Sequence, residues 1–346
     1  MHLLRLPALF AGLFLSSAAL AADPAAIALD YADTFAIPRF QKVAQAAHAQ
    51  QDAWSRFCTG RGAGTAEPLR DAYNALADAW AQVEFVRIGP AAIALRAERF
   101  NWWLDRTDAT GKALNAMLAS DPATLTVEML ATGSVAGQGL PVIERLIYPQ
   151  EEASKLMGDA GAQRCAVGLA VAREQSRIAD DIVADWTAPD GARAALAANT
   201  RWKVAFADGK EAASVMMTDL VAGLETLKDL KVAMLFHDVT NGKAPRLAEA
   251  ARSGRTTKDI ALNLQAIREG LSPFMAGASV NARTQLDVAF DDARRRLDEF
   301  DRAAPADRQA AITRALAVFV TLSQTAMTVT PQATGLTLGF NMLDGD

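Results

Sequence analysis

The sequence predicts an all-α protein built from two consecutive up-and-down helical bundles. Long segments repeat apolar residues at helical spacing, as in Glu67–Phe85 and Ala160–Trp186, and strand-like alternation of apolar and polar residues is essentially absent. The breaks between these segments are short and rich in glycine or proline, and short links favour antiparallel neighbouring helices. About 325 residues remain after a predicted signal peptide, a length that fits two domains.

The amino terminus has the features of a cleavable secretory signal. Arg5 is its only charge, Leu6–Leu15 form an apolar core too short to span a bilayer, and Ala19–Ala21 offers a cleavage site of the A-x-A type. No cysteine follows, so no lipid anchor is expected. We therefore predict that residues 1–21 are a signal peptide and that the mature protein is periplasmic, without a membrane span. An uncleaved amino-terminal anchor is the alternative.

The mature chain is predicted to divide at the turn-rich break Thr187–Gly191. Residues 22–188 then form the first bundle, and residues 189–346 form the second bundle with a docked carboxyl-terminal tail. Within the first bundle, Ile37-Pro38 is expected to interrupt a helix, because proline cannot continue the hydrogen-bond ladder. The second bundle is predicted to contain helices over Ala192–Ala207, Glu211–Phe236, Asp259–Glu269, Asn281–Phe300 and Asp307–Gln324.

Charge and cysteine content narrow the function classes. The formal net charge is −5, which argues against nucleic acid or an anionic membrane surface as a partner. The two cysteines, Cys58 and Cys165, are most simply a disulfide in an oxidising compartment. Such a bond closes a loop of about 107 residues, and chain entropy predicts a stabilisation of about 4–5 kcal/mol from it.

Motifs of the common enzyme classes are missing from the sequence. The mature chain has two histidines, His48 and His237, and neither belongs to an H-E-x-x-H motif. There is also no G-x-S-x-G nucleophile motif and no dinucleotide-binding fingerprint. We therefore assign no catalytic residue from motifs.

One short stretch carries a family resemblance. Gly137–Tyr148, reading GQGLPVIERLIY, resembles the Gly-x-His-x-x-Glu region of the imelysin family, with Gly139 at the motif's glycine, Pro141 at its histidine and Glu144 at its glutamate. Further segments that resemble the family, in the same order along nearly the whole mature chain, are Ala79–Pro90, Arg99–Asp105, Ser253–Leu264 and Gly335–Asp346.

The resemblance implies a secreted or envelope-attached protein of two helical bundles. The family includes metallopeptidases that cleave insulin and proteins associated with iron regulation or uptake, and its metal site is expected at the motif. Pro141 supplies no ligand atom, so Glu144 is the remaining candidate ligand for iron or zinc. In the competing interpretation Pro141 occupies a first helical turn and Glu144 is a buried or capping acid paired with Arg87 or Arg99.

Two further groups of residues are interpreted structurally. Glu84 and Arg87 lie three residues apart on a predicted helix, a spacing that permits a surface ion pair. Trp102 and Trp103 are interpreted as a packed helix corner rather than as a cage for a ligand, because aromatic side chains mainly serve cores.

Three functions are compatible with these features. The first is a binding or accessory role linked to the acquisition of iron or another metal. The second is a metal-dependent peptidase, which would need a metal, an activated water and a general base, and which is weakened by the loss of a ligand at Pro141. The third is a helical envelope scaffold that binds a protein partner in the groove between the bundles.

Overall fold

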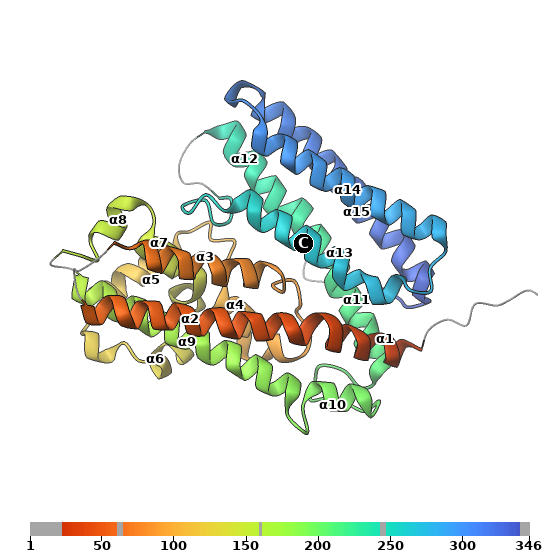
Figure 1. The fold of residues 1–346 in the computed structure, drawn as a ribbon, viewed down its shortest axis with the longest axis horizontal. Coiled ribbons are helices and arrows are strands. Elements are labelled where there is room, and N and C mark those ends of the chain that lie inside the picture. The colour runs from red at the N-terminus through yellow and green to blue at the C-terminus, as the bar shows by residue number, and fades with distance from the viewer. Residues whose placement is uncertain (1–22, 61–64, 159–160, 243–246, 340–346) are drawn as a thin grey trace, which may run out of the picture.

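The fold is all-α, as the sequence predicts. The computed structural model describes residues 23–60, 65–158, 161–242 and 247–339. Within these ranges every named element is a helix, and the one isolated β-bridge joins Trp202 to Phe206. Figure 1 shows the first half as a layer of long helices and the second half as a group of helices that cross this layer obliquely. The predicted signal peptide lies outside the described residues.

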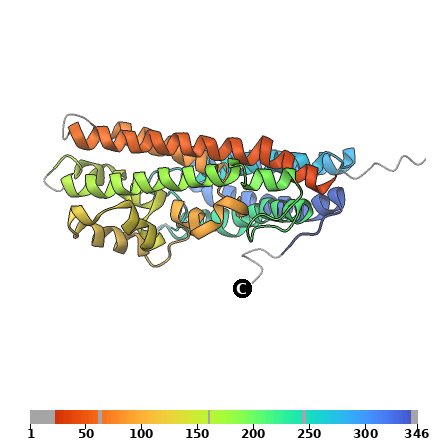
Figure 2. The same ribbon diagram turned by 90° about the horizontal axis from the view of Figure 1, so that it is seen from below.

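The first half is built around one long antiparallel pair. α2 (Ile37–Gly60) packs along α9 (Gly161–Thr187) and also against α3 (Glu67–Ala81). Figure 2 shows α2 and α9 side by side along the length of the molecule, with shorter segments as a further layer at one end. These shorter helices are α4 (Arg96–Phe100), α5 (Ala109–Leu118), α6 (Val127–Thr132), α7 (Gly139–Ile147) and α8 (Gln150–Ser154).

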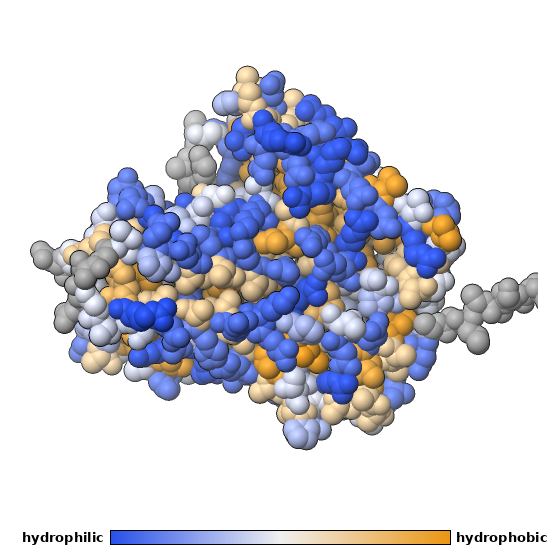
Figure 3. Space-filling view, in the orientation of Figure 1, coloured by the Kyte–Doolittle hydropathy of each residue, from blue (hydrophilic) through white to orange (hydrophobic). Residues whose placement is uncertain are grey.

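The second half contains a helical hairpin packed on three further helices. The hairpin consists of α14 (Val280–Arg302) and α15 (Arg308–Thr334). Its outer helix α14 is highly charged, and hydrophilic residues dominate its front face in Figure 3. The three helices that the hairpin contacts are α11 (Gly209–Thr226), α12 (Ala233–Asn241) and α13 (Thr256–Met275), while α10 (Ala192–Ala197) packs on α1 and α9.

One helix, Pro305–Thr334, is long and apolar enough to cross a membrane by length and composition alone. A core helix of a soluble protein passes the same test, and 39% of its most apolar window is buried inside the protein. The helix also packs against α11, α12, α13 and α14.

The predicted helix break at Ile37-Pro38 is wrong. A π-helical turn, Ala32–Ala36, joins α1 (Pro24–Tyr31) directly to α2, and the Ile37 N–H donates to the Ala32 carbonyl. Proline in a regular helix would clash with the carbonyl four residues before it. The wider π turn immediately before Pro38 lets the helix continue. A second π-helical turn, Leu227–Val232, joins α11 to α12 in the same way.

The predicted helix Ala192–Ala207 is too long. α10 ends at Ala197, and the chain then turns through Asn199 (φ 50°) and Lys203 (φ 48°). These left-handed backbone conformations end a helix. Conversely, α15 continues ten residues beyond the predicted end at Gln324.

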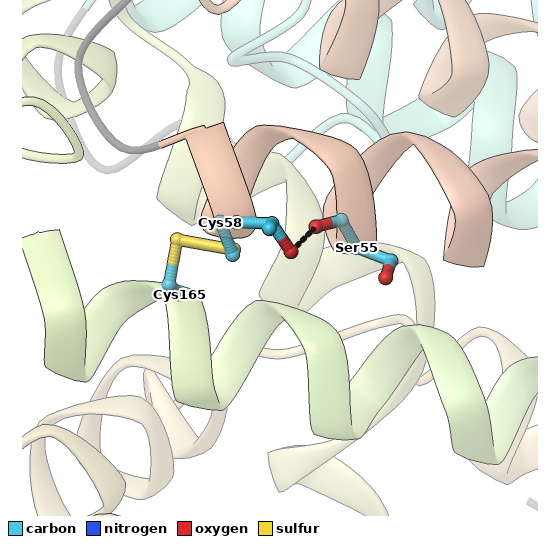
Figure 4. The surroundings of a disulfide bond; sticks show 4 residues. Ser55, Cys58 and Cys165 are labelled. Atoms are coloured by element: carbon cyan, nitrogen blue, oxygen red, sulfur yellow. Dashed lines mark hydrogen bonds between the residues drawn. A yellow bond between two sulfur atoms is a disulfide. The ribbon is translucent and has the colours of Figure 1, made fainter.

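The predicted disulfide is present and ties the end of α2 to the start of α9. Cys58 and Cys165 are joined with their Cα atoms 5.6 Å apart, an ordinary separation for a disulfide (Figure 4). The bond therefore closes the open end of the longest helix pair in the first half.

The two halves share one hydrophobic core. α1 extends from the first half onto α11, and α3 packs against α13. Buried apolar residues form a continuous cluster from Ile27 on α1 to Leu336 after α15. The predicted boundary at residues 188 and 189 falls between α9 and α10, and the division into two domains stays a prediction.

Candidate binding site

The motif helix α7 begins at a glycine that no other residue could replace without strain. Gly139 has φ +74°, and a Cβ at this position would collide with the Phe100 carbonyl. Pro141 lies in the first turn of α7, where its missing N–H costs no helical hydrogen bond. Glu144 follows one turn later and is only 7% exposed.

Glu144 binds a serine from the other half of the molecule. Its Oε1 accepts hydrogen bonds from the Ser253 backbone N–H at 2.8 Å and from the Ser253 hydroxyl at 2.6 Å. Burial raises the pKa of the Glu144 carboxyl, while the Ser253 hydrogen bonds and the nearby Arg252 and Arg145 act to lower it. Neither hydrogen bond uses Oε2, which leaves this oxygen for another partner.

The expected pairing of Glu144 with Arg87 or Arg99 is not formed. Arg87 instead donates to Glu98 at 2.8 Å. Arg99 forms a buried ion pair with Glu174 on α9. Each arginine is therefore paired with another acid, and the hydrogen bonds to Glu144 come from the neutral donors of Ser253.

The predicted surface pair between Glu84 and Arg87 is also wrong. α3 ends at Ala81, so both residues lie beyond the helix and the three-residue helical spacing does not apply. Glu84 points instead toward the second half, where it forms an ion pair with Lys231.

Lys231 is the centre of a buried charge cluster that the sequence did not reveal. Its ammonium contacts Glu84, Glu249 Oε2 at 2.6 Å and Asn263 Oδ1 at 2.7 Å. Asn101 donates to both carboxylates, at 2.6 Å to Glu249 and 3.3 Å to Glu84. We call these five residues the Lys231 cluster. No distinct signal in the sequence marked Lys231, because Lys228 and Asp229 lie in the same π turn.

Electrostatics explain how this cluster holds its charges. Burial raises the pKa of Glu84, and the neighbouring Glu249 raises it further. Burial alone would lower the pKa of Lys231, but the two carboxylates outweigh it and raise this pKa above its ordinary value. Lys231 therefore stays protonated throughout the physiological range.

Glu144 lines a cavity of about 420 Å³ at the junction of the two halves, which we call the motif cavity. Pro141 and Glu144 line it from the first half, and Leu247–Arg252 line it from the second half. Aromatic side chains that line it are Tyr73, Trp80, Trp102 and Trp103.

Trp102 and Trp103 differ from their predicted role as a packed helix corner. α4 ends at Phe100, so both tryptophans follow it in an irregular segment and stay partly exposed to the cavity. The Trp103 indole N–H donates to the Leu247 carbonyl at 3.1 Å, which fixes this ring across the junction. Both rings therefore line the cavity, and a role as a ligand cage stays a prediction.

More acidic than arginine side chains line the motif cavity, but several of these acids already accept hydrogen bonds from other groups of the protein. Asp105 accepts from the backbone N–H groups of Ala109 and Thr110, and Asp108 pairs with Arg145 at 2.5 Å. Arg106 and Arg252 also line the cavity, and both are exposed. Their guanidinium groups are available to an incoming anionic group.

The residues around Glu144 do not fit a bare metal ion. Pro141 replaces the only imidazole of the motif, and nowhere in the described ranges do three His, Cys, Asp or Glu side chains gather as metal ligands. His48 bonds Asp180 on the surface and His237 bonds Asp238. Metal ligation by Glu144 stays a prediction, and we derive no metal-dependent step from this geometry.

These features define a helical protein of two packed halves with a ligand-sized cavity where they meet, bordered by a Gly-x-Pro-x-x-Glu helix. The sequence model of the imelysin family (peptidase M75) matches residues 36–325. The chain therefore belongs to the imelysin family.

Two solved structures share the fold. An imelysin-like protein from Psychrobacter arcticum 273-4 has a TM-score of 0.72 and 19% sequence identity, and the match covers 92% of this chain and 97% of that one. A protein from Parabacteroides distasonis ATCC 8503, named as an iron-regulated protein A precursor, has a TM-score of 0.71 and 15% identity, with coverage of 90% and 95%. No curated protein matches the sequence significantly.

Proposed function

We propose that this protein is a non-catalytic binding protein with an accessory role in the acquisition of iron or another metal, and that its cargo is a metal chelate bound in the motif cavity. The observation that carries the proposal is the cavity itself. It lies against the family motif, its volume of about 420 Å³ suits a small organic ligand, and aromatic rings line its walls. The name of the Parabacteroides distasonis protein supports the link to iron.

A chelate fits this cavity better than a bare ion because it brings its own donor atoms. A bare ion would need several convergent protein ligands, and the motif offers Glu144 alone. An organic chelator presents flat apolar surface and anionic groups. Trp102 and Trp103 suit the former, and the guanidinium groups of Arg106 and Arg252 suit the latter.

The peptidase and scaffold functions are less well supported. A metallopeptidase activates water on its metal, and the proline at the motif's histidine removes a donor for that metal. A scaffold would require an extended docking surface, whereas the family motif here borders a cavity of small-molecule size. Periplasmic location, predicted from the amino terminus, would bring the protein into contact with imported chelates.

The proposal is tested by binding of two iron(III) complexes, with citrate and with catechol, measured by calorimetry and by metal analysis after gel filtration. We expect one complex to bind with one-to-one stoichiometry. Replacing Trp102 by alanine should weaken binding about threefold to tenfold through loss of ring contact. Arg252→Ala should weaken it as well, whereas Arg201→Ala, at an exposed arginine outside the cavity, should not.

Other outcomes would replace the proposal. Failure of both complexes to bind would refute a chelate cargo of these types. Stoichiometric binding of zinc or iron without chelator, lost in Glu144→Gln, would show that the motif holds a bare ion after all. Chelator-sensitive cleavage of denatured insulin would favour the peptidase.

A further inference from the structure

A second cavity, of about 430 Å³, lies behind the Lys231 cluster. We call it the Asp219 cavity. Its walls come from α11, from the π turn Leu227–Val232, from α13 and from the segment that follows α3. Residues that border both cavities are Glu84, Asn101, Trp103 and Glu249. The Gly139–Glu144 motif does not line this second space.

The walls of the Asp219 cavity are mostly apolar. Residues that supply this surface are Phe85, Val215, Ala222, Leu227, Leu230 and Ile267. Gly223 leaves room between them, because a Cβ there would lie 3.0 Å from both Phe85 and Ile267. The volume lies within the range of small-molecule sites, which combine apolar walls with a few polar groups.

Asp219 is the acid in this cavity without a cationic partner. Its Oδ2 accepts the Arg87 backbone N–H at 2.6 Å, but no ion pair reaches it within the described chain. The Arg87 guanidinium pairs with Glu98, and the Lys231 ammonium is held by Glu84 and Glu249. A carboxylate in an apolar wall is costly unless a cation or a proton neutralises it.

We infer that the Asp219 cavity binds a small, largely apolar molecule that carries one ammonium group, with that group placed against the Asp219 carboxylate. The site is separate from the proposed chelate site and does not depend on it. Its apolar walls suit the body of such a ligand, and the carboxylate provides a charge-assisted hydrogen bond to its amine.

One backbone group of the last described residue also borders the cavity. Gly339 borders the cavity, and its N–H donates to the Thr218 hydroxyl at 2.9 Å. Among the described residues, no lysine or arginine forms an ion pair with Asp219, so we assign the positive charge to a ligand.

The site should also respond to pH. Burial raises the pKa of Asp219 to about 7, against the lowering effect of the Arg87 and Ile88 backbone N–H groups and of the Arg87 charge. On the neighbouring elements, burial keeps Tyr31 neutral, and Lys231 stays protonated beside Glu84 and Glu249. An alkylammonium stays charged between pH 6 and pH 8, whereas Asp219 loses its proton over this range. The affinity of the cavity for the ammonium should therefore rise as pH increases from 6 to 8.

The test compares 2-phenylethylamine with its uncharged analogue 2-phenylethanol and its anionic analogue 3-phenylpropanoate, by calorimetry at pH 6, 7 and 8. We expect the amine alone to bind one-to-one and its affinity to increase with pH. Asp219→Asn should weaken amine binding at pH 8 by at least about tenfold and remove the pH dependence. Asp229→Asn, which removes an exposed aspartate of the π turn Leu227–Val232, should change neither the affinity nor its pH dependence.

Two further variants keep the result decisive if Asp219→Asn folds poorly. Ala222→Phe fills the cavity and should abolish amine binding, while Glu144→Gln in the motif cavity should leave it unchanged. Equal binding of the amine and the alcohol, an affinity that does not depend on pH, or an amine site lost in Glu144→Gln would each overturn the inference. So would the absence of binding by any amine up to millimolar concentration.

Discussion

At Lys231 a single ammonium serves two buried carboxylates that come from opposite halves of the chain. Glu84 follows α3, whereas Glu249 lies in the segment before α13, and the Lys231 side chain is only 5% exposed. Two acids that share one base leave one negative charge to be stabilised by Asn101 and Asn263. The Lys231 ammonium is therefore the group that links Glu84 of the first half to Glu249 of the second half.

Replacing Lys231 by methionine should therefore be severely destabilising. The apolar side chain preserves volume but leaves two carboxylates buried without a cation, a change that typically costs about 3–5 kcal/mol. Urea denaturation followed by circular dichroism measures the loss. Lys228→Met, at a lysine paired with Asp229 on the same π turn, should cost less than about 1 kcal/mol. Equal losses in the two variants would show that the cluster does not stabilise the fold.

For single residues, the sequence identified Glu144 as a candidate but did not identify its partner Ser253. The position of Glu144 on an apolar helical face indicated burial, and it is buried. Ser253, which binds it, lies 109 residues away in sequence, so no local spacing could reveal the contact. The pairing of Glu84 failed for the same reason, since its base comes from a helix of the other half.

Among the helices, the crossing of α2 and α9 depends on one small residue. Gly168 on α9 lies directly against the Trp54 ring of α2, and a Cβ at this position would overlap the ring. Trp54 is fully buried, so it has little space to move. The glycine thus sets how closely the longest pair of helices can approach.

Gly168→Ala should accordingly destabilise the protein, although alanine favours a helix more than glycine does. Overpacking of this kind costs about 1–3 kcal/mol and outweighs the gain in helix propensity of about 1 kcal/mol. The loss of stability should appear as a lower midpoint temperature in thermal unfolding. Gly60→Ala is the matched control, because nothing lies within 4 Å of the Cβ it would add. A Gly168→Ala variant as stable as the wild type would mean that Trp54 can shift without cost.

Helix type and approximate position were predictable because apolar periodicity records which face each helix buries. Local interruptions of the helices were less predictable. Proline usually predicts a helix break, but the π turn at Ala32–Ala36 lets the helix continue through Pro38. Whether the helix continues there depends on how α1 packs on α11. The disulfide was predictable because the predicted oxidising compartment and an even cysteine count left one simple pairing.

For the molecule as a whole, polar contacts across the junction decide how the halves meet. Besides Glu144 with Ser253 and the Lys231 cluster, Arg255 reaches from the second half to Asp78 at 2.5 Å and to Asn74 at 3.0 Å. Both cavities lie along this junction. The two-bundle fold followed from the sequence, but the cavities arise from contacts between distant segments and needed the structure.

The same junction should make stability depend on pH. Asp219 and Asp259 each have a pKa raised to about 7 by burial, from 3.8 in an unfolded chain. The folded protein therefore holds more protons than the unfolded one between these values. The stabilising contribution of these two aspartates is therefore fully present below pH 4. It is lost as the pH rises through 7.

Asp219→Asn should remove one of these contributions, since an amide keeps the hydrogen bond from the Arg87 backbone but does not ionise. Relative to the wild type, the variant should gain about 1–3 kcal/mol in free energy of unfolding between pH 5 and pH 8. Urea denaturation at several pH values gives this difference directly. Asp229→Asn, at an exposed aspartate, should follow the wild-type curve. Parallel curves for the wild type and Asp219→Asn would show that Asp219 ionises in the folded protein as it does in the unfolded chain, and the unpaired carboxylate would then have no energetic reason to attract a cation.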